Sequence, residues 1–194
     1  MRSICKLLFC CVATLAAAQD SAPPKLSATP LSADQIAVYR AFLTNYTAGS
    51  KRTLNVANIT ETFEPDTDSM LSSGNRRDSC LSQFPAKVHA TEVHLLPDSV
   101  TTTQVRLVDP TKHKLADPGD AIQTPSDVDS AVDAGLAAGL MTLSEVVFDT
   151  QHHRAAFSYS FVCGRLCGTG GIVIYNLQNG RWTRSSRRCG GWVS

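Results

Sequence analysis

An aromatic strand-like segment, a cysteine- and glycine-rich connection and an aliphatic strand-like segment follow one another in Phe157-Ser-Tyr-Ser-Phe-Val-Cys-Gly-Arg-Leu-Cys-Gly-Thr-Gly-Gly-Ile-Val-Ile-Tyr-Asn-Leu-Gln-Asn-Gly-Arg-Trp182. From Phe157, large aromatic and small polar side chains alternate, which is the pattern of a strand with one packed face. Apart from Asn176, residues 172–177 are β-branched, aromatic or aliphatic, and the dipeptide Asn179-Gly180 that follows is the best suited to a type I′ turn. The stretch therefore predicts antiparallel strands joined by tight turns.

A two-residue turn also predicts the register of the second hairpin. Leu177 should face Trp182, and Tyr175 should face Arg184 across the strands. We expect Trp182 to lie in the core, because its partner and the strand before it are apolar.

The connection between the first two strands allows three interpretations. Cys163 and Cys167 could form a disulfide, supply two metal ligands, or include a catalytic thiol. No second pair of ligands follows with the spacing of a zinc site. Gly168-Thr-Gly-Gly171 lacks the Lys-Ser/Thr and the helix of a phosphate-binding loop, so we expect these glycines to serve positive φ angles in a strand connection.

The N-terminus has the three parts of a secretory signal peptide. Arg2 and Lys6 precede an apolar run over residues 7–15, and Ala16-Ala-Ala18 offers the small residues of a cleavage site. Residues 1–18 are therefore expected to be removed, giving an exported protein, periplasmic or secreted, with no transmembrane segment in the mature chain. A formal net charge of +1 for the whole chain gives no indication of a nucleic-acid partner.

The same cleavage would change the cysteine count. Of the seven cysteines in the sequence, only Cys80, Cys163, Cys167 and Cys189 lie after residue 18. An even number of cysteines in an exported chain favours disulfides, because the compartment is oxidising.

The C-terminal part contains an aromatic strand, the motif Cys-Gly-x-Leu-Cys-Gly-x-Gly, an aliphatic strand, an Asn-Gly-x-Trp turn and a terminal Trp-Val-Ser. From about Leu143 to Ser194 this pattern resembles a group of predicted exported bacterial proteins with no established activity, and residues 38–43 are also similar. In that group the last strand runs straight into Trp-Ile/Val-Ser, whereas Cys189-Gly-Gly191 intervenes here. The resemblance implies a family of exported proteins and no particular chemistry.

The cysteine pairing that we expect is Cys163–Cys167 with Cys80–Cys189. Gly164 lets the turn bring the first two Cβ atoms together, and the resemblance implies that the related group carries this pair without Cys189. Four cysteines allow three pairings, so Cys80 and Cys189 are left for each other.

The N-terminal third predicts a leader and a helix. Residues 19–31 contain three prolines and predict an extended, poorly ordered leader. Ser32 and Gln35 have the spacing of a capping box. An apolar stripe then recurs at helical spacing through Ile36, Tyr39, Leu43 and Tyr46.

The middle of the chain is less clearly patterned. Residues 53–60, 93–96 and 104–108 predict strands, and residues 109–125 predict a long loop. A helix beginning after Ser126 would carry an apolar stripe formed by Val128, Val132, Leu136 and Leu140. His152 and His153 lie together in the turn after residue 148, where histidines are usually solvated.

These patterns predict a single α+β domain over residues 32–194, with an antiparallel meander sheet of about five to seven strands and the N-terminal helix packed on one face. No catalytic, cofactor-binding or metal-binding residue is identified. We expect a non-catalytic exported domain, stabilised by disulfides, that binds a protein or a cell-envelope component. The alternative is a metal-binding or thiol-dependent enzyme built on the Cys163–Cys167 loop.

Overall fold

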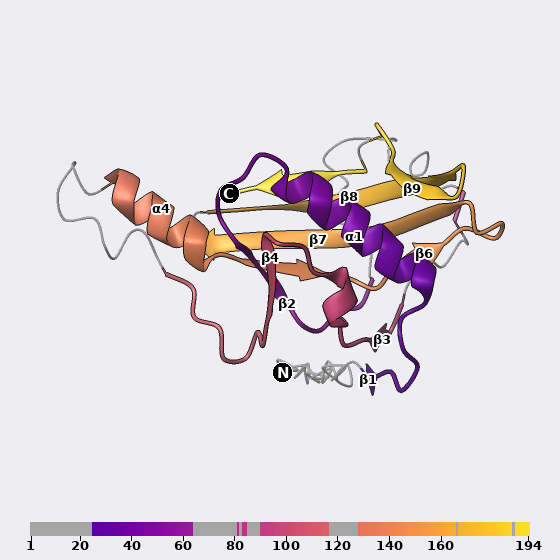
Figure 1. The fold of residues 1–194 in the computed structure, drawn as a ribbon, viewed down its shortest axis with the longest axis horizontal. Helices are drawn as coiled ribbons and strands as arrows, with labels where there is room; N and C mark the ends of the chain where they lie inside the picture. Colours follow the sequence, from indigo (N-terminus) through magenta and orange to yellow (C-terminus); the bar gives the residue numbers. More distant parts are fainter. Residues whose placement is uncertain are drawn as a thin grey trace, which may run out of the picture.

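The structure is a computed structural model that describes residues 25–63, 81, 83–84, 90–116, 128–165, 167–187 and 189–194. They form a single α+β fold in which helix α1 (Ala33–Thr47) crosses one face of a curled, mixed sheet (Figure 1). The strands of this sheet are β2 (Leu54–Ala57), β4 (Val105–Val108), β5 (Leu140–Leu143), β6 (Val147–Phe148), β7 (Arg154–Gly164), β8 (Cys167–Gln178), β9 (Arg181–Arg184) and β10 (Gly191–Val193).

The sheet contradicts the prediction of a pure antiparallel meander of about five to seven strands. Within the described residues it has eight strands, in the order β10-β8-β7-β5-β2-β4, with β6 paired to β7 and β9 paired to β8. Strand β2 lies between β4 and β5 and runs parallel to both. The segments that separate these strands in the sequence are long enough for the crossovers that parallel pairing needs. All four residues of β2 are buried, as in strands covered on both faces.

Helix α1 begins and packs as the sequence predicts. Ser32 Oγ accepts a hydrogen bond from the Gln35 backbone N–H at 3.2 Å, and the Gln35 side chain accepts one from the Ser32 N–H at 2.8 Å. These two bonds satisfy N–H groups that a helix start leaves without partners. The buried face of the helix consists of Val38, Tyr39, Phe42, Leu43 and Thr47.

The aromatic face of β7 lies against α1. The ring of Phe157 is 5.4 Å from that of Tyr39 and 5.2 Å from that of Phe42, both edge-on. Tyr159 continues the contact, with its ring 5.1 Å from that of Phe42. Edge-on aromatic pairs add to the free energy gained by burial, so this cluster is a main source of stability between helix and sheet.

The second hairpin has the predicted register. Leu177 pairs with Trp182 and Tyr175 pairs with Arg184. Asn179 and Gly180 have φ angles of 51° and 73°, which both central positions of a type I′ turn require. Trp182 is 8% exposed and belongs to the main core, as expected.

Helix α4 (Val128–Ala138) presents a different face from the predicted one. Val128 and Val132 are 40% and 42% exposed, and the buried residues are Ala131 and Gly135. The helix lies at one end of the sheet (Figure 1), where small side chains allow close approach. The prediction is wrong for Val128 and Val132, whereas Leu136 packs against the main core. The last member of the predicted stripe, Leu140, begins β5.

Polar side chains hold the C-terminal end of α4. The amide of Asn55, which is 1% exposed, donates to the carbonyls of Ala137 and Gly139 at 3.0 Å each. His113 Nε2 lies 2.7 Å from the Ala138 carbonyl. These contacts satisfy carbonyl groups that the end of a helix leaves without partners, so the buried Asn55 and the partly exposed His113 have a structural role.

Part of the predicted leader is packed on the domain. Strand β1 (Lys25–Leu26) pairs in parallel with β3 (Glu92–Val93), and Leu31 is 8% exposed. Residues 1–24, including the predicted signal peptide, lie outside the described residues. None of the helices within the described ranges is long and apolar enough to span a bilayer.

Candidate functional site

The Cys163–Cys167 connection is a tight hairpin end closed by a disulfide. The two Cα atoms are 5.1 Å apart, within the range that a disulfide can bridge. Gly164, with a φ angle of 147°, pairs with Cys167 across the hairpin. In this oxidised state neither sulfur is a thiolate that could attack a substrate or bind a metal. In the described part of the chain no three His, Cys, Asp or Glu side chains gather as metal ligands.

Cys189 is also disulfide-bonded and only 6% exposed. Cys80 lies outside the described residues, so the pairing Cys80–Cys189 stays a prediction. Non-reducing peptide mapping of the purified, oxidised protein is expected to recover one peptide joined through Cys163–Cys167 and one through Cys80–Cys189. A peptide joining Cys163 to Cys189 would contradict this pairing, and four free thiols would favour the metal or thiol alternative.

The glycines after the hairpin end do not have the predicted role. Gly168, Gly170 and Gly171 lie inside β8 and have no positive φ angle. A Cβ atom on Gly170 would lie 2.4 Å from Nε1 of Trp192, and one on Gly168 would lie 2.8 Å from its Cζ3. The glycines therefore make room for an indole ring that lies directly on the backbone of β8.

This arrangement places Trp192 at the surface on the sheet face opposite α1. Trp192 pairs with Gly170, which pairs in turn with Ser160, and Ser160 pairs with Thr142. Cross-strand partners share a face of a sheet, and the alternate residues of β7 pack under α1. The indole remains 44% exposed, while Ser160 and Thr142 are partly exposed. We call the residues Trp192, Gly168, Gly170, Ser160 and Thr142 the Trp192 surface.

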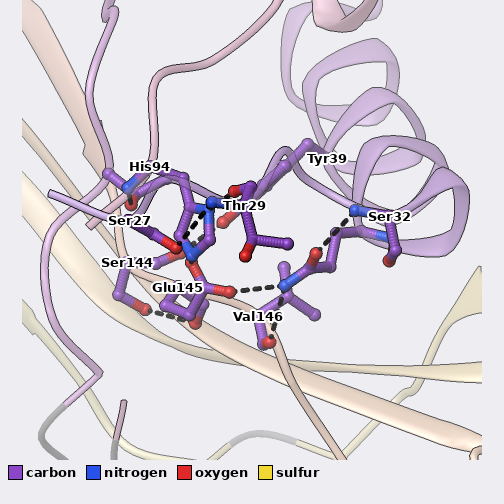
Figure 2. A network of polar contacts seen from close by, with 10 residues as sticks. Ser27, Thr29, Ser32, Tyr39, His94, Ser144, Glu145 and Val146 are labelled. Carbon is purple, nitrogen blue, oxygen red and sulfur yellow. Dashed lines mark hydrogen bonds and ion pairs between the residues drawn. The ribbon is translucent and has the colours of Figure 1, made fainter. Parts of the chain in front are cut away.

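A second candidate is a buried polar network beneath residues 25–31, shown in Figure 2. His94 and Glu145 are 9% and 7% exposed, and His94 Nε2 lies 3.4 Å from Glu145 Oε2. The other ring nitrogen of His94, Nδ1, lies 3.0 Å from the Thr29 carbonyl oxygen. Glu145 Oε1 accepts a hydrogen bond from the side-chain amide of Gln35.

The electrostatics of the network follow from its burial. Removal from water raises the pKa of Glu145 above its ordinary value, and the positive charge of a protonated His94 and the Gln35 hydrogen bond act in the opposite direction. Glu145 Oε2 makes no hydrogen bond within the described residues, so its contact with His94 is the one that matters for its proton. Burial also raises the pKa of Tyr39, whose hydroxyl donates to the Ser144 carbonyl at 2.7 Å.

The network joins four segments that are far apart in the sequence. Thr29 precedes α1, Gln35 lies in its first turn, His94 follows β3 and Glu145 lies between β5 and β6. The backbone N–H of His94 is itself bound by Thr60 Oγ1 at 2.8 Å, which fixes the position of the imidazole. A buried network of this kind is satisfied only when all of its members are in place.

Sequence reasoning missed this network. It identified Gln35 as a capping residue and had no role for His94 or Glu145. The available signal is that Glu145 is the charged residue of the mainly apolar run from Leu140 to Phe148, and a charge that becomes buried needs a partner. Nothing in the sequence indicates which partner it meets.

The turn histidines have different surroundings. His152 is not simply solvated, because its Nε2 lies 3.0 Å from Asp34 Oδ2 and its ring stacks on Phe148 at 4.0 Å. His153 is exposed and borders a shallow polar hollow at this turn, together with Asp149 and Arg154. Asp149 Oδ1 already accepts the backbone N–H groups of His153 and Arg154, which makes it a turn-stabilising residue.

Comparison with known proteins adds no assignment: no protein-family model, no curated protein and no solved structure matches the chain.

Proposed function

We propose that the protein is a non-catalytic, exported, disulfide-stabilised domain that binds a cell-envelope component or a protein through the Trp192 surface. The observation that carries this proposal is the side chain of Trp192 in β10. Trp192 is 44% exposed, and its indole lies against the glycines of the neighbouring strand β8. An exposed tryptophan offers a large contact area and is a typical anchor of binding surfaces.

The two glycines beneath the Trp192 indole support a binding role, because they restrict how the ring can move. A side chain that is already held in one orientation loses little conformational entropy when a ligand covers it. Gly168 and Gly170 have no side chains beneath the indole, so the ring can rest directly on the backbone of β8. The inner face of the ring is fixed on the backbone while the outer face stays open to a ligand.

The chemistry of the neighbouring side chains favours an envelope polymer over a protein. Thr142 and Ser160 place hydroxyl groups along the same cross-strand row as Trp192. A flat aromatic ring beside hydroxyl groups fits a ligand that has both apolar faces and hydroxyl groups, as a polysaccharide has. A protein partner that buries its own apolar side chains would leave these hydroxyls without hydrogen bonds, at a cost.

The test is co-sedimentation of the purified exported protein with insoluble bacterial cell-wall polysaccharide. We expect Trp192→Ala to weaken binding by about tenfold or more, since loss of a binding anchor costs about 2 kcal/mol or more. Val193→Ala is the matched control, because Val193 is adjacent, 84% exposed and on the other side of the strand.

Two results would contradict the proposal. If Trp192→Ala and the wild type sediment equally, the Trp192 surface is not the binding surface. If the wild type binds no envelope fraction at all, the protein does not bind an envelope component, and that part of the proposal is wrong. A circular dichroism spectrum and an unfolding curve for each variant show that any loss of binding comes from the surface and not from the fold.

A further inference from the structure

We propose that the His94–Glu145 pair is a pH-sensitive latch, which holds the segment before α1 on the domain in mild acid and loosens it as the pH rises. We call this segment, residues 25–31, the N-terminal strap. It is independent of the Trp192 surface, which lies on the other face of the sheet.

Within the described residues, the strap is held by its pairing with β3 and by contacts at Ser27 and Thr29. The Ser27 N–H donates to the Val93 carbonyl at 2.8 Å, and the Thr29 carbonyl lies 3.0 Å from His94 Nδ1. Leu31 is buried, but Leu26 is 50% exposed. A segment with so few buried contacts opens locally at a small cost in free energy, so one polar contact has a large share in holding it.

The geometry determines where the protons must be. A carbonyl oxygen only accepts, so His94 Nδ1 carries the hydrogen that binds Thr29. His94 Nε2 then has no hydrogen to share with Glu145 Oε2 unless the pair has taken up one more proton. With that proton the two atoms attract each other, and without it two lone pairs face each other in a buried place.

The groups around the pair do not remove this requirement. Among the described residues, Glu92 at the start of β3 also acts on Glu145, and its repulsion favours the protonated form. Gln35 donates to Oε1 and leaves Oε2 unchanged. Tyr39 points its hydroxyl to the Ser144 carbonyl. In Figure 2 the Glu145 side chain lies between the His94 ring and the side chains at the start of α1.

The direction of the pH effect follows from linkage. In the docked state His94 Nδ1 keeps its hydrogen for the Thr29 carbonyl, so the buried Glu145, whose pKa burial raises, faces a bare Nε2 unless the pair takes up a proton. In the released state the imidazole can carry its one hydrogen on Nε2 and donate it to the Glu145 carboxylate without that extra proton. The docked state therefore binds the proton more tightly. This contribution to docking is complete below the ordinary carboxyl pKa and is lost as the pH rises through the raised pKa.

Release of the strap changes the surface of the domain. Strand β1 is the partner of β3 in a two-stranded parallel sheet. When β1 leaves, the N–H and C=O groups of Glu92 and Val93 lose their partners, and such an edge is a template for another strand. The latch thus couples the pH of the compartment to an edge that a second chain can pair with.

The test is hydrogen–deuterium exchange of the exported protein from about pH 5 to about pH 8, read at the strap amide of Ser27 and at β3. The comparison variant is Glu145→Gln, which keeps the acceptor for Gln35 and can donate to His94 Nε2 at every pH. Because both proteins are compared at the same pH, the intrinsic pH dependence of exchange cancels. Glu61→Gln is the matched control. The side chain of Glu61 is exposed, and its backbone carbonyl, which the substitution does not change, accepts the Glu145 N–H.

As the pH rises from about 5 to about 8, we expect the protection of the strap in the wild type to fall about tenfold relative to that in Glu145→Gln. A tenfold change corresponds to the cost of leaving one buried acceptor without a partner. Amides of the β8–β9 hairpin should not change, and Glu61→Gln should behave as the wild type. Equal pH dependence in wild type and Glu145→Gln, or parallel loss of protection in the β8–β9 hairpin, overturns the latch.

A second measurement needs no variant and so does not depend on the folding of Glu145→Gln. The carboxyl carbon of Glu145 can be followed by NMR through the same pH range. Its titration midpoint should coincide with the midpoint at which the strap loses protection. If the two midpoints differ, the proton on Glu145 does not control the strap and the proposal is wrong.

Discussion

Replacing Trp182 with alanine is expected to lower the free energy of unfolding by about 3–5 kcal/mol, the cost of removing a large buried aromatic side chain. Trp182 is 8% exposed and its ring lies 5.6 Å from that of Phe148. Its Nε1 also donates to Asp34 Oδ1 at 3.1 Å, in the first turn of α1. The substitution would remove both the packing and the hydrogen bond that connect β9 to the helix.

Denaturant unfolding of the intact, oxidised protein measures this effect, and the chain has a matched control. Trp192 is the other of its two tryptophans and is 44% exposed, so Trp192→Ala should change the free energy of unfolding much less. Equal destabilisation by the two substitutions would show that burial does not account for the stability at Trp182.

Phe157→Ala should have an effect of the same size, about 3–5 kcal/mol, by a different route. Phe157 is completely buried at the middle of β7 and touches the rings of Tyr39, Phe42 and Tyr175. Alanine would leave a cavity between α1 and the sheet that rigid neighbouring rings cannot fill.

Phe157→Leu is the control for the cavity, because it keeps most of the apolar volume and should cost less than about 1.5 kcal/mol. Ser158→Ala, one position along the strand on the other face, should be close to neutral. A Leu variant as unstable as the Ala variant would contradict the cavity explanation and assign the effect to the aromatic contacts themselves.

The C-terminal hairpins could be predicted because their information is local. Asn179-Gly180 determines the turn, the turn determines the register, and the aromatic alternation from Phe157 determines the packed face. The capping box of Ser32 and Gln35 determined the start of α1 in the same way. In each case residues within about four positions of one another contain the whole signal.

The position of β2 could not be predicted, because its partners are set by distant segments. Leu54–Ala57 pairs with strands that begin about fifty and about eighty-five residues later, and no feature of the four residues names them. The exposed valines of α4 show the same limit, since helical periodicity gives a stripe and not the surface that it meets.

The candidate sites needed the three-dimensional structure for the same reason. The glycines of β8 could be seen in the sequence, but their role could not. It becomes clear only in the structure, where β10 pairs with β8 and the indole of Trp192 lies on the glycines. His94 and Glu145 were visible too, and their contact depends on four segments meeting beneath the strap. The residue types therefore showed that these positions were unusual, but the contacts that give them a role depend on how distant segments meet in the fold.

The mixed sheet divides the chain into parts that should assemble at different times. Strands β5 to β9 are antiparallel neighbours joined by short turns, so their loops close at small entropic cost and they can form early. Strand β2 joins β4 and β5 only after much longer loops have closed. We therefore expect the insertion of β2 to be the slow step of folding, with the edge of β5 open to pairing with other chains until it occurs.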